Sequence, residues 1–229
     1  MFLPEIISEI VESIRPTSAI TAIVDNANGL YTVTVTKLDT LLVDNQFVSI
    51  SDTPNFNTDS TEVYNVNYSA KTFDIKLTTG QAISTFGTFT AKAPFFDYSD
   101  TLLEYSNNLT LEQQKTFRKD IEMFPAVYMP SKVNETDLGN YTDFEVTNLV
   151  LLFINFTDLD NDTEGRYTSD MPYLFDLYTK FKKALNKHDK INFDVNFSHE
   201  KDTFTELEEN EAVSQIIATT SLTYSTNEC

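Results

Sequence analysis

The first regular pattern along the chain is helical and lies near its beginning. Between Pro4 and Ile14, isoleucine and valine recur every three or four residues, and glutamates occupy the opposite face. Pro4 suits the first position of a helix, whereas Pro16 prevents the helix from extending much further. A helix this short is marginal alone, so it must dock, either on its own chain or on a neighbouring subunit.

From about residue 18 to residue 94 the apolar period changes to two, which is typical of β-strands. Turn-forming clusters such as Asn26–Gly29 and Pro54–Asn55 separate the apolar segments. The strands predicted here are Ala19–Val24, Leu30–Lys37, Gln46–Ser51, Glu62–Ser69, Thr72–Thr78 and Thr88–Lys92. Short strands in this number, without a helical segment among them, predict a small barrel or sandwich.

Helical and strand patterns are mixed beyond Pro94. A capping-box pattern at Thr110 predicts a helix through about Glu122, and a second helix is predicted from Pro172 to about Lys187. The predicted strands are Pro125–Met129, Glu145–Phe156, Ile191–Phe197 and Ala212–Tyr224, with an acidic loop at Glu200–Glu211. This order predicts an antiparallel or mixed sheet with helices packed on one face.

These patterns predict an α+β chain of three parts. An N-terminal amphipathic helix occupies residues 1–16, and a small β-barrel-like module follows at residues 17–95. An α+β domain completes the chain at residues 96–229.

Composition narrows the range of functions. The chain has 35 acidic and 16 basic residues, a formal net charge of −19. This balance argues against broad binding to duplex phosphate or to anionic lipid, because both require a basic surface. The longest apolar run, Leu149–Ile154, is far shorter than the roughly 20 residues of a membrane helix. The first residues lack the basic and apolar segments of a secretory signal, so we expect an intracellular protein without a membrane partner.

Residue types that usually carry catalysis are scarce. The chain has two histidines, His188 and His199, and one cysteine, Cys229, and neither histidine has an acid–base partner visible in the sequence. No phosphate-binding or nucleophile-elbow motif occurs. The sequence therefore predicts a non-enzymatic chain with no catalytic, cofactor-binding or metal-binding residues and no cofactor.

One acidic segment resembles the start of a calcium-binding loop. Asp158, Asp160 and Asp162 alternate as calcium ligands do, but the glycine and glutamate that such a loop needs are replaced by Thr163 and Ser169. A solvated loop is the better interpretation.

Two charged runs are the candidate contact residues. The basic run is Lys180, Lys182, Lys183 and Lys187, and the acidic run is Glu206, Glu208, Glu209 and Glu211. Lysines at the end of a helix favour the helix dipole, and acidic runs are usually solvated. The functional alternative is that the basic run of one copy contacts the acidic run of the next, since opposite patches on one chain suit ring-forming contacts.

The order of elements in the second half resembles a known family. The segments that carry the resemblance are Phe124–Met129, Phe153–Phe156, Glu164–Tyr167, Met171–Tyr178 and Ile191–Phe197. Over about residues 97–225 this order is similar to the tail-terminator-like neck and ring proteins of tailed bacteriophages, including those in the tail barrel of crAss-like phages. The barrel-like module departs from the plainest members of that family.

The resemblance implies a structural virion protein of the head–tail connector or tail barrel, made in the bacterial cytoplasm. Its partners would be copies of itself in a ring and neighbouring portal, ring or tail proteins, and DNA would pass through the channel without specific binding. The alternative is a non-enzymatic binding module, such as a tail-fibre adaptor, whose barrel recognises a carbohydrate or peptide.

Overall fold

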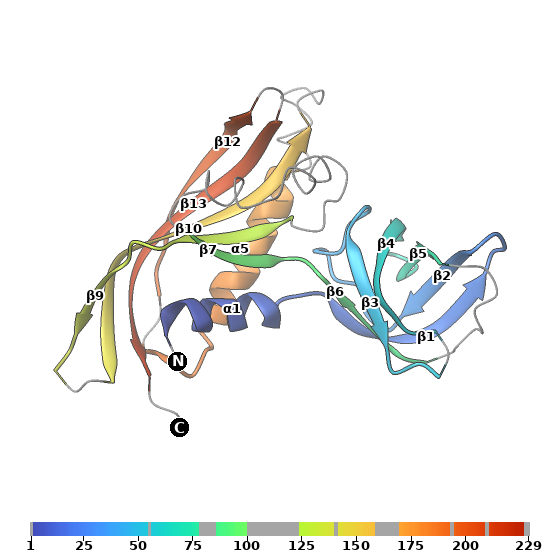
Figure 1. Ribbon diagram of the computed structural model, residues 1–229, viewed down its shortest axis with the longest axis horizontal. Coiled ribbons are helices and arrows are strands. Elements are labelled where there is room, and N and C mark those ends of the chain that lie inside the picture. The colour runs from blue at the N-terminus through green and yellow to red at the C-terminus, as the bar shows by residue number, and fades with distance from the viewer. Residues whose placement is uncertain are drawn as a thin grey trace. The chain divides into compact units, whose positions relative to one another are not determined.

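The computed structural model divides the chain into two compact units (Figure 1). The barrel unit is Arg15–Ala93, and the sheet unit joins Met1–Ile14 to Pro94–Cys229. The structure describes residues 2–54, 56–77, 86–99, 124–139, 142–158, 170–192, 195–208 and 211–226. The helix predicted at 110–122 lies outside the described residues, as do Asp160 and Asp162.

The barrel unit is a closed antiparallel barrel, which confirms the predicted small all-β module. Its strands are β1 (Thr17–Asp25), β2 (Leu30–Val35), β3 (Phe47–Ser51), β4 (Thr58–Asn67), β5 (Thr72–Lys76) and β6 (Thr88–Ala91). They follow the order β1-β2-β5-β4-β3-β6. Strand β1 closes the barrel because its first residues pair with β6 and the rest pair with β2, with an irregularity between Ile20 and Ala22.

Alternating residues of these strands, together with Phe56 between β3 and β4, fill the barrel with aromatic side chains. Tyr31 packs edge-on against Phe56 at a centroid distance of 5.0 Å, and Phe73 packs in the same way against Phe89 at 5.1 Å. The fully buried Tyr31 hydroxyl has no hydrogen-bond partner in the described part of the chain. An unpaired buried hydroxyl costs about 1–3 kcal/mol, which the packing around it must offset.

The sheet unit contains a mixed sheet. Its strands are β7 (Phe95–Ser99), β8 (Ala126–Pro130), β9 (Asn134–Asp137), β10 (Asp143–Asp158), β11 (Ile191–Asn192), β12 (Ser198–Glu208) and β13 (Glu211–Ser225). The main order is β11-β13-β10-β8-β7, with β12 also pairing with β13 and β9 with β10. Only the β7–β8 pair is parallel among the described pairs. The predicted fold class, a barrel followed by an α+β sheet domain, is confirmed.

The prediction of an acidic loop at 200–211 is wrong. Most of this segment is strand β12, which pairs with β13 from Ser198 to Glu208. The strand predicted at Ile191–Phe197 is correspondingly reduced to Ile191–Asn192 among the described residues. Charged residues at the edge of a sheet stay solvated, so the pattern of this strand resembles that of a loop.

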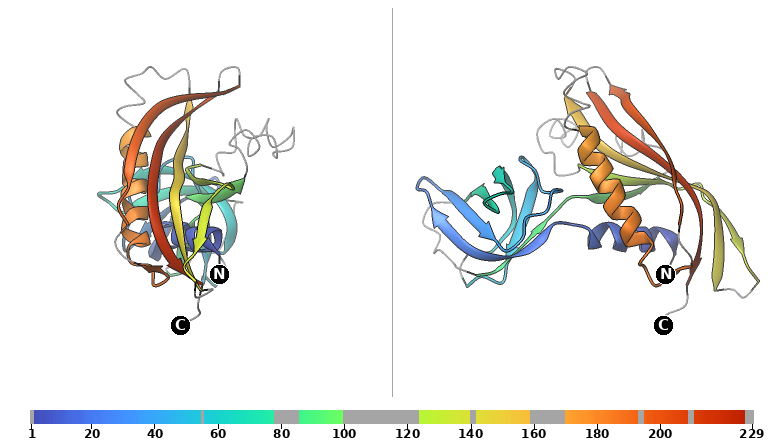
Figure 2. Two further views of the ribbon diagram at one scale, coloured as in Figure 1. Left: turned by 90° about the vertical axis from the view of Figure 1, so that its left-hand side faces the viewer. Right: turned by 180° about the vertical axis from the view of Figure 1, so that it is seen from behind.

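Helix α5 (Met171–Leu185) covers one face of the sheet, where it contacts β10 and β13 (Figure 2). Alternate residues of β10 and β13 form the buried face, and Phe153 of β10 lies edge-on to Tyr178 and Phe181 of the helix. Helix α1 (Leu3–Ser13) buries its aliphatic face and contacts β7 and α5. It therefore docks on its own chain, which was one of the two alternatives left by the sequence.

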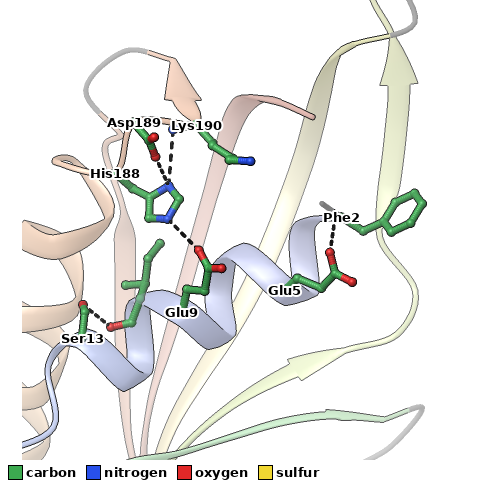
Figure 3. Close-up of polar contacts among 8 residues, drawn as sticks. Phe2, Glu5, Glu9, Ser13, His188, Asp189 and Lys190 are labelled. Carbon is green, nitrogen blue, oxygen red and sulfur yellow. Dashed lines mark hydrogen bonds and ion pairs between the residues drawn. The ribbon is translucent and has the colours of Figure 1, made fainter. Parts of the chain in front are cut away.

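His188, which follows α5, lies against α1 (Figure 3). Its Nε2 atom is 3.5 Å from a carboxylate oxygen of Glu9, and its Nδ1 atom is 3.4 Å from one of Asp189. Its side chain is only 15% exposed. The sequence shows no partner for His188, because the carboxylate beside it belongs to Glu9, which is distant in sequence. This contact helps to hold α1 on the sheet unit.

Tyr224 connects three parts of the sheet unit. Its ring is almost fully buried and stacks on Phe144 at 5.5 Å, and its hydroxyl donates a hydrogen bond to Oε1 of Glu135 at 3.2 Å. The backbone amide of Leu3 donates to the same hydroxyl. Burial, together with the nearby Glu135 carboxylate, raises the pKa of Tyr224 to about 12.

This pKa predicts a loss of stability in alkali. In the unfolded chain Tyr224 ionises near pH 10, whereas in the folded protein it keeps its proton to a pKa of about 12. The unfolded state therefore binds fewer protons between these values, and we expect the free energy of unfolding to fall across that window by about 1–3 kcal/mol. Urea denaturation followed by circular dichroism at pH 9 to 12 measures this fall.

The Tyr224→Phe variant is the control, because the other tyrosines are common to both proteins. It should be less stable than the original chain at neutral pH and should lose less stability across the alkaline window. Equal slopes for the two proteins would contradict the prediction.

Candidate subunit-contact site

Helix α5 presents two different faces. Leu174, Leu177 and Phe181 are fully buried against the sheet. On another side of the helix, Phe175 is 41% exposed, and Lys182 and Lys183 follow it in the last turns. The exposed aromatic ring is the first sign of a surface that differs from an ordinary solvated helix face.

A groove lies beside this face. Its volume is about 420 Å³, and it is lined by Phe175, Tyr178, Thr179, Lys182, Lys183, Asn186, Phe197 and His199. A smaller hollow of about 220 Å³ shares Phe175 and is lined also by Met171, Pro172 and Lys201. The two hollows together follow α5 on one side and the start of β12 on the other.

Aromatic rings form the floor of the groove. Tyr178 contacts Phe197 edge-on at a centroid distance of 5.9 Å and His199 at 5.2 Å. Phe175 contacts His199 at 5.8 Å. Burial raises the pKa of the Tyr178 hydroxyl, so this side chain stays neutral at physiological pH.

Asn186 fixes the opposite wall. Its Oδ1 atom accepts a hydrogen bond from the backbone amide of Val195 at 2.7 Å, and its Nδ2 atom donates to the carbonyl of the same residue at 3.4 Å. This pair of bonds joins the end of α5 to the segment that enters β12. The Asn186 side chain therefore fixes one wall of the groove to the backbone at Val195.

The lysines of the basic run occupy different environments. Lys180 forms an ion pair with Asp176, one helical turn away, at 2.8 Å. Lys182 and Lys183 line the groove and form no ion pair with a described residue. Lys187 is exposed beyond the end of the helix and does not line the groove. The structure thus brings together only two of the four predicted basic residues.

Lys201 is a further groove cation that the sequence analysis did not select. Its Nζ atom lies 5.2 Å from the centre of the Phe175 ring, which is the geometry of a cation–π contact. Phe197, His199 and Lys201 stand at every second position. This spacing was the available signal for a strand with one packed face. The strand predicted from the sequence ended at Phe197, so His199 and Lys201 were not placed on it.

The acidic run lies at the end of the β12–β13 hairpin. Glu208 pairs in register with Glu211, which on its other side pairs with Asp158 of β10. Glu206 pairs with Ala212, and Glu209 lies outside the described residues. Three acidic residues therefore occupy directly paired positions on three neighbouring strands.

Figure 2 shows that α5 runs away from the end of the β12–β13 hairpin, toward the other end of the sheet. Asp170, just before α5, lies beside Ser214, and Lys182 follows 12 residues later (182 − 170), about 18 Å along the helix. Glu211 lies three residues before Ser214 on β13, about 10 Å along the strand and away from Lys182. Along this path Lys182 and Glu211 are about 28 Å apart, whereas Lys201 is nearer to the hairpin end because it lies on β12 itself.

Comparisons with protein-family models, with curated proteins and with solved structures found no match to this chain. Within the described residues, no helix is long and apolar enough to cross a membrane. Nor do the described side chains include a group of three or more histidine, cysteine, aspartate or glutamate residues placed to hold a metal ion. The groove and the acidic hairpin end are accordingly the surfaces from which a function can be argued.

Proposed function

We propose that this chain is a non-enzymatic structural protein that assembles head to tail into a homo-oligomeric ring. The observation that carries the proposal is the pair of oppositely charged surfaces on the sheet unit, a groove lined by Lys182 and Lys183 and the acidic end of the β12–β13 hairpin. A contact between two different surfaces of identical chains is heterologous, and such contacts close into a ring when the rotation between copies allows it.

The setting proposed for the ring is the neck or tail barrel of a tailed bacteriophage virion. The order of elements in the sheet unit supports this setting through the resemblance described above. The formal net charge of −19 also suits a channel wall, because repulsion keeps passing DNA from binding to it. The neighbouring portal, ring or tail proteins are the further partners, and the barrel unit is available as an added module that contacts one of them.

The test is the size of the purified full-length chain. Light scattering coupled to size-exclusion chromatography should give a mass that is a whole-number multiple of 26.1 kDa, and negative-stain images of the same peak should show closed rings. A chain that remains monomeric at every soluble concentration, and that also forms no ring when phage neck and tail proteins are added, would contradict the proposal. Such a monomer would favour the adaptor alternative, which ligand screening of the barrel unit would then examine.

A further inference from the structure

The cations of the groove are available to a partner. Lys182, Lys183 and Lys201 surround an aromatic floor and form no ion pair with a described residue, whereas Lys180 is already paired with Asp176. On a chain with 35 acidic residues against 16 basic ones, three such lysines around one groove are a local reversal of charge. A surface of this kind favours an acidic partner that also has apolar side chains.

The acidic hairpin end has the complementary chemistry. Asp158, Glu211 and Glu208 stand at paired backbone positions on adjacent strands, so acidic residues follow one another across the sheet there. Residues 202–213 read Asp-Thr-Phe-Thr-Glu-Leu-Glu-Glu-Asn-Glu-Ala-Val, so apolar Phe204 and Leu207 lie among the carboxylates.

We propose that the groove between α5 and β12 receives the acidic hairpin end, residues 202–213, of the neighbouring copy. Lys182, Lys183 and Lys201 contact its carboxylates, and the aromatic floor formed by Tyr178, Phe197 and His199 contacts its apolar residues. Lys180 and Lys187 take no part. This inference rests on the proposed ring and identifies the two surfaces that form its subunit contact.

A synthetic peptide of residues 202–213 tests the groove separately from assembly. The receptor is the full chain carrying Glu206→Lys and Glu208→Lys, in which the hairpin end can no longer occupy a neighbour's groove. Fluorescence anisotropy of the labelled peptide should show saturable binding that weakens as sodium chloride is raised, because the contact depends on charge. A peptide with its four glutamates replaced by glutamine should bind at least tenfold more weakly.

Two receptor variants locate the contact. Adding Lys182→Glu and Lys183→Glu should weaken peptide binding at least tenfold, whereas adding Lys187→Glu should change it less than twofold. Lys187 is the matched control because it is also a lysine near the C-terminal end of α5 but lies outside the groove. Circular dichroism establishes that each variant is folded before binding is measured.

The possible outcomes separate this inference from the proposed function. If the peptide shows no saturable binding, or if Lys187→Glu weakens binding as much as Lys182→Glu/Lys183→Glu does, the groove is not the binding site of residues 202–213. This conclusion would hold even if the unmodified chain forms rings. Binding that depends on Lys182 and Lys183 would support the groove as a site for the acidic segment even if the unmodified chain does not close into rings. In that case the ring proposal would fail alone.

Discussion

Phe153→Ala is expected to destabilise the sheet unit by about 3–5 kcal/mol, the largest effect expected from a single substitution in this chain. Phe153 is fully buried near the middle of β10. Its ring lies edge-on to Tyr178 at 5.4 Å and to Phe181 at 5.3 Å, so it contacts two residues of the helix that packs on the sheet. Truncation removes both aromatic contacts and leaves a cavity that the paired strands cannot fill by collapsing.

The loss should be confined to the sheet unit. The core of the barrel consists of its own residues, such as Tyr31, Phe73 and Phe89, and does not include Phe153. Amide hydrogen exchange should therefore show weaker protection in β10, β13 and α5, with unchanged protection in the barrel strands. Phe153→Leu is the control, because it keeps most of the volume and should cost about 1 kcal/mol. A cost below about 1 kcal/mol for the alanine variant would mean that Phe153 does not anchor the helix.

Segments whose apolar period matched their structure could be predicted from the sequence. The amphipathic patterns at residues 4–14 and 172–187 became α1 and α5, and the apolar run near Leu149–Ile154 became the centre of β10. In the barrel, alternation placed each strand within a few residues of its observed position. In these elements the burial of one face dictates the spacing of apolar residues, so local sequence is sufficient.

Elements defined by distant partners could not be predicted. All residues of β9 are exposed and polar, and only pairing with β10 makes them a strand. Strand β12 has His199 and Lys201 at positions that pack on aromatic rings, and long polar side chains at such positions conceal the alternation. Glu9 and His188 illustrate the same limit, because 179 positions (188 − 9) separate two side chains that meet in the fold.

The candidate site was predicted in part for the same reason. The two charged runs were visible as composition, but their arrangement required the register of β12 with β13 and the placement of α5 along them. Neighbouring lysines of the basic run have different environments in the fold. Lys180 pairs with Asp176, whereas Lys182 and Lys183 line the groove. The spacing of Asp176 and Lys180 on the predicted helix was the available signal for their ion pair, whereas nothing in the sequence indicated the groove or its aromatic floor.

Reversing both groove lysines is expected to abolish assembly of the proposed ring, and reversing the acidic end as well is expected to restore it. In Lys182→Glu/Lys183→Glu, each acidic hairpin end would face another acidic surface, and like charges across a contact cost several kcal/mol. In Glu206→Lys/Glu208→Lys the two surfaces would both be basic, with the same result. Light scattering should therefore give a monomer for each double variant alone.

The decisive sample is an equal mixture of the two double variants. The groove of each variant then complements the hairpin end of the other, so we expect alternating copies to associate. A single chain that carries all four substitutions should associate with itself. If the two variants associate only when they are mixed, misfolding cannot be the reason that each is monomeric alone. One variant can stabilise the other only if their surfaces bind. Lys187→Glu, which reverses one lysine outside the groove, should assemble as the original chain does. If the mixture remains monomeric while the original chain forms rings, the subunit contact does not pair these two surfaces.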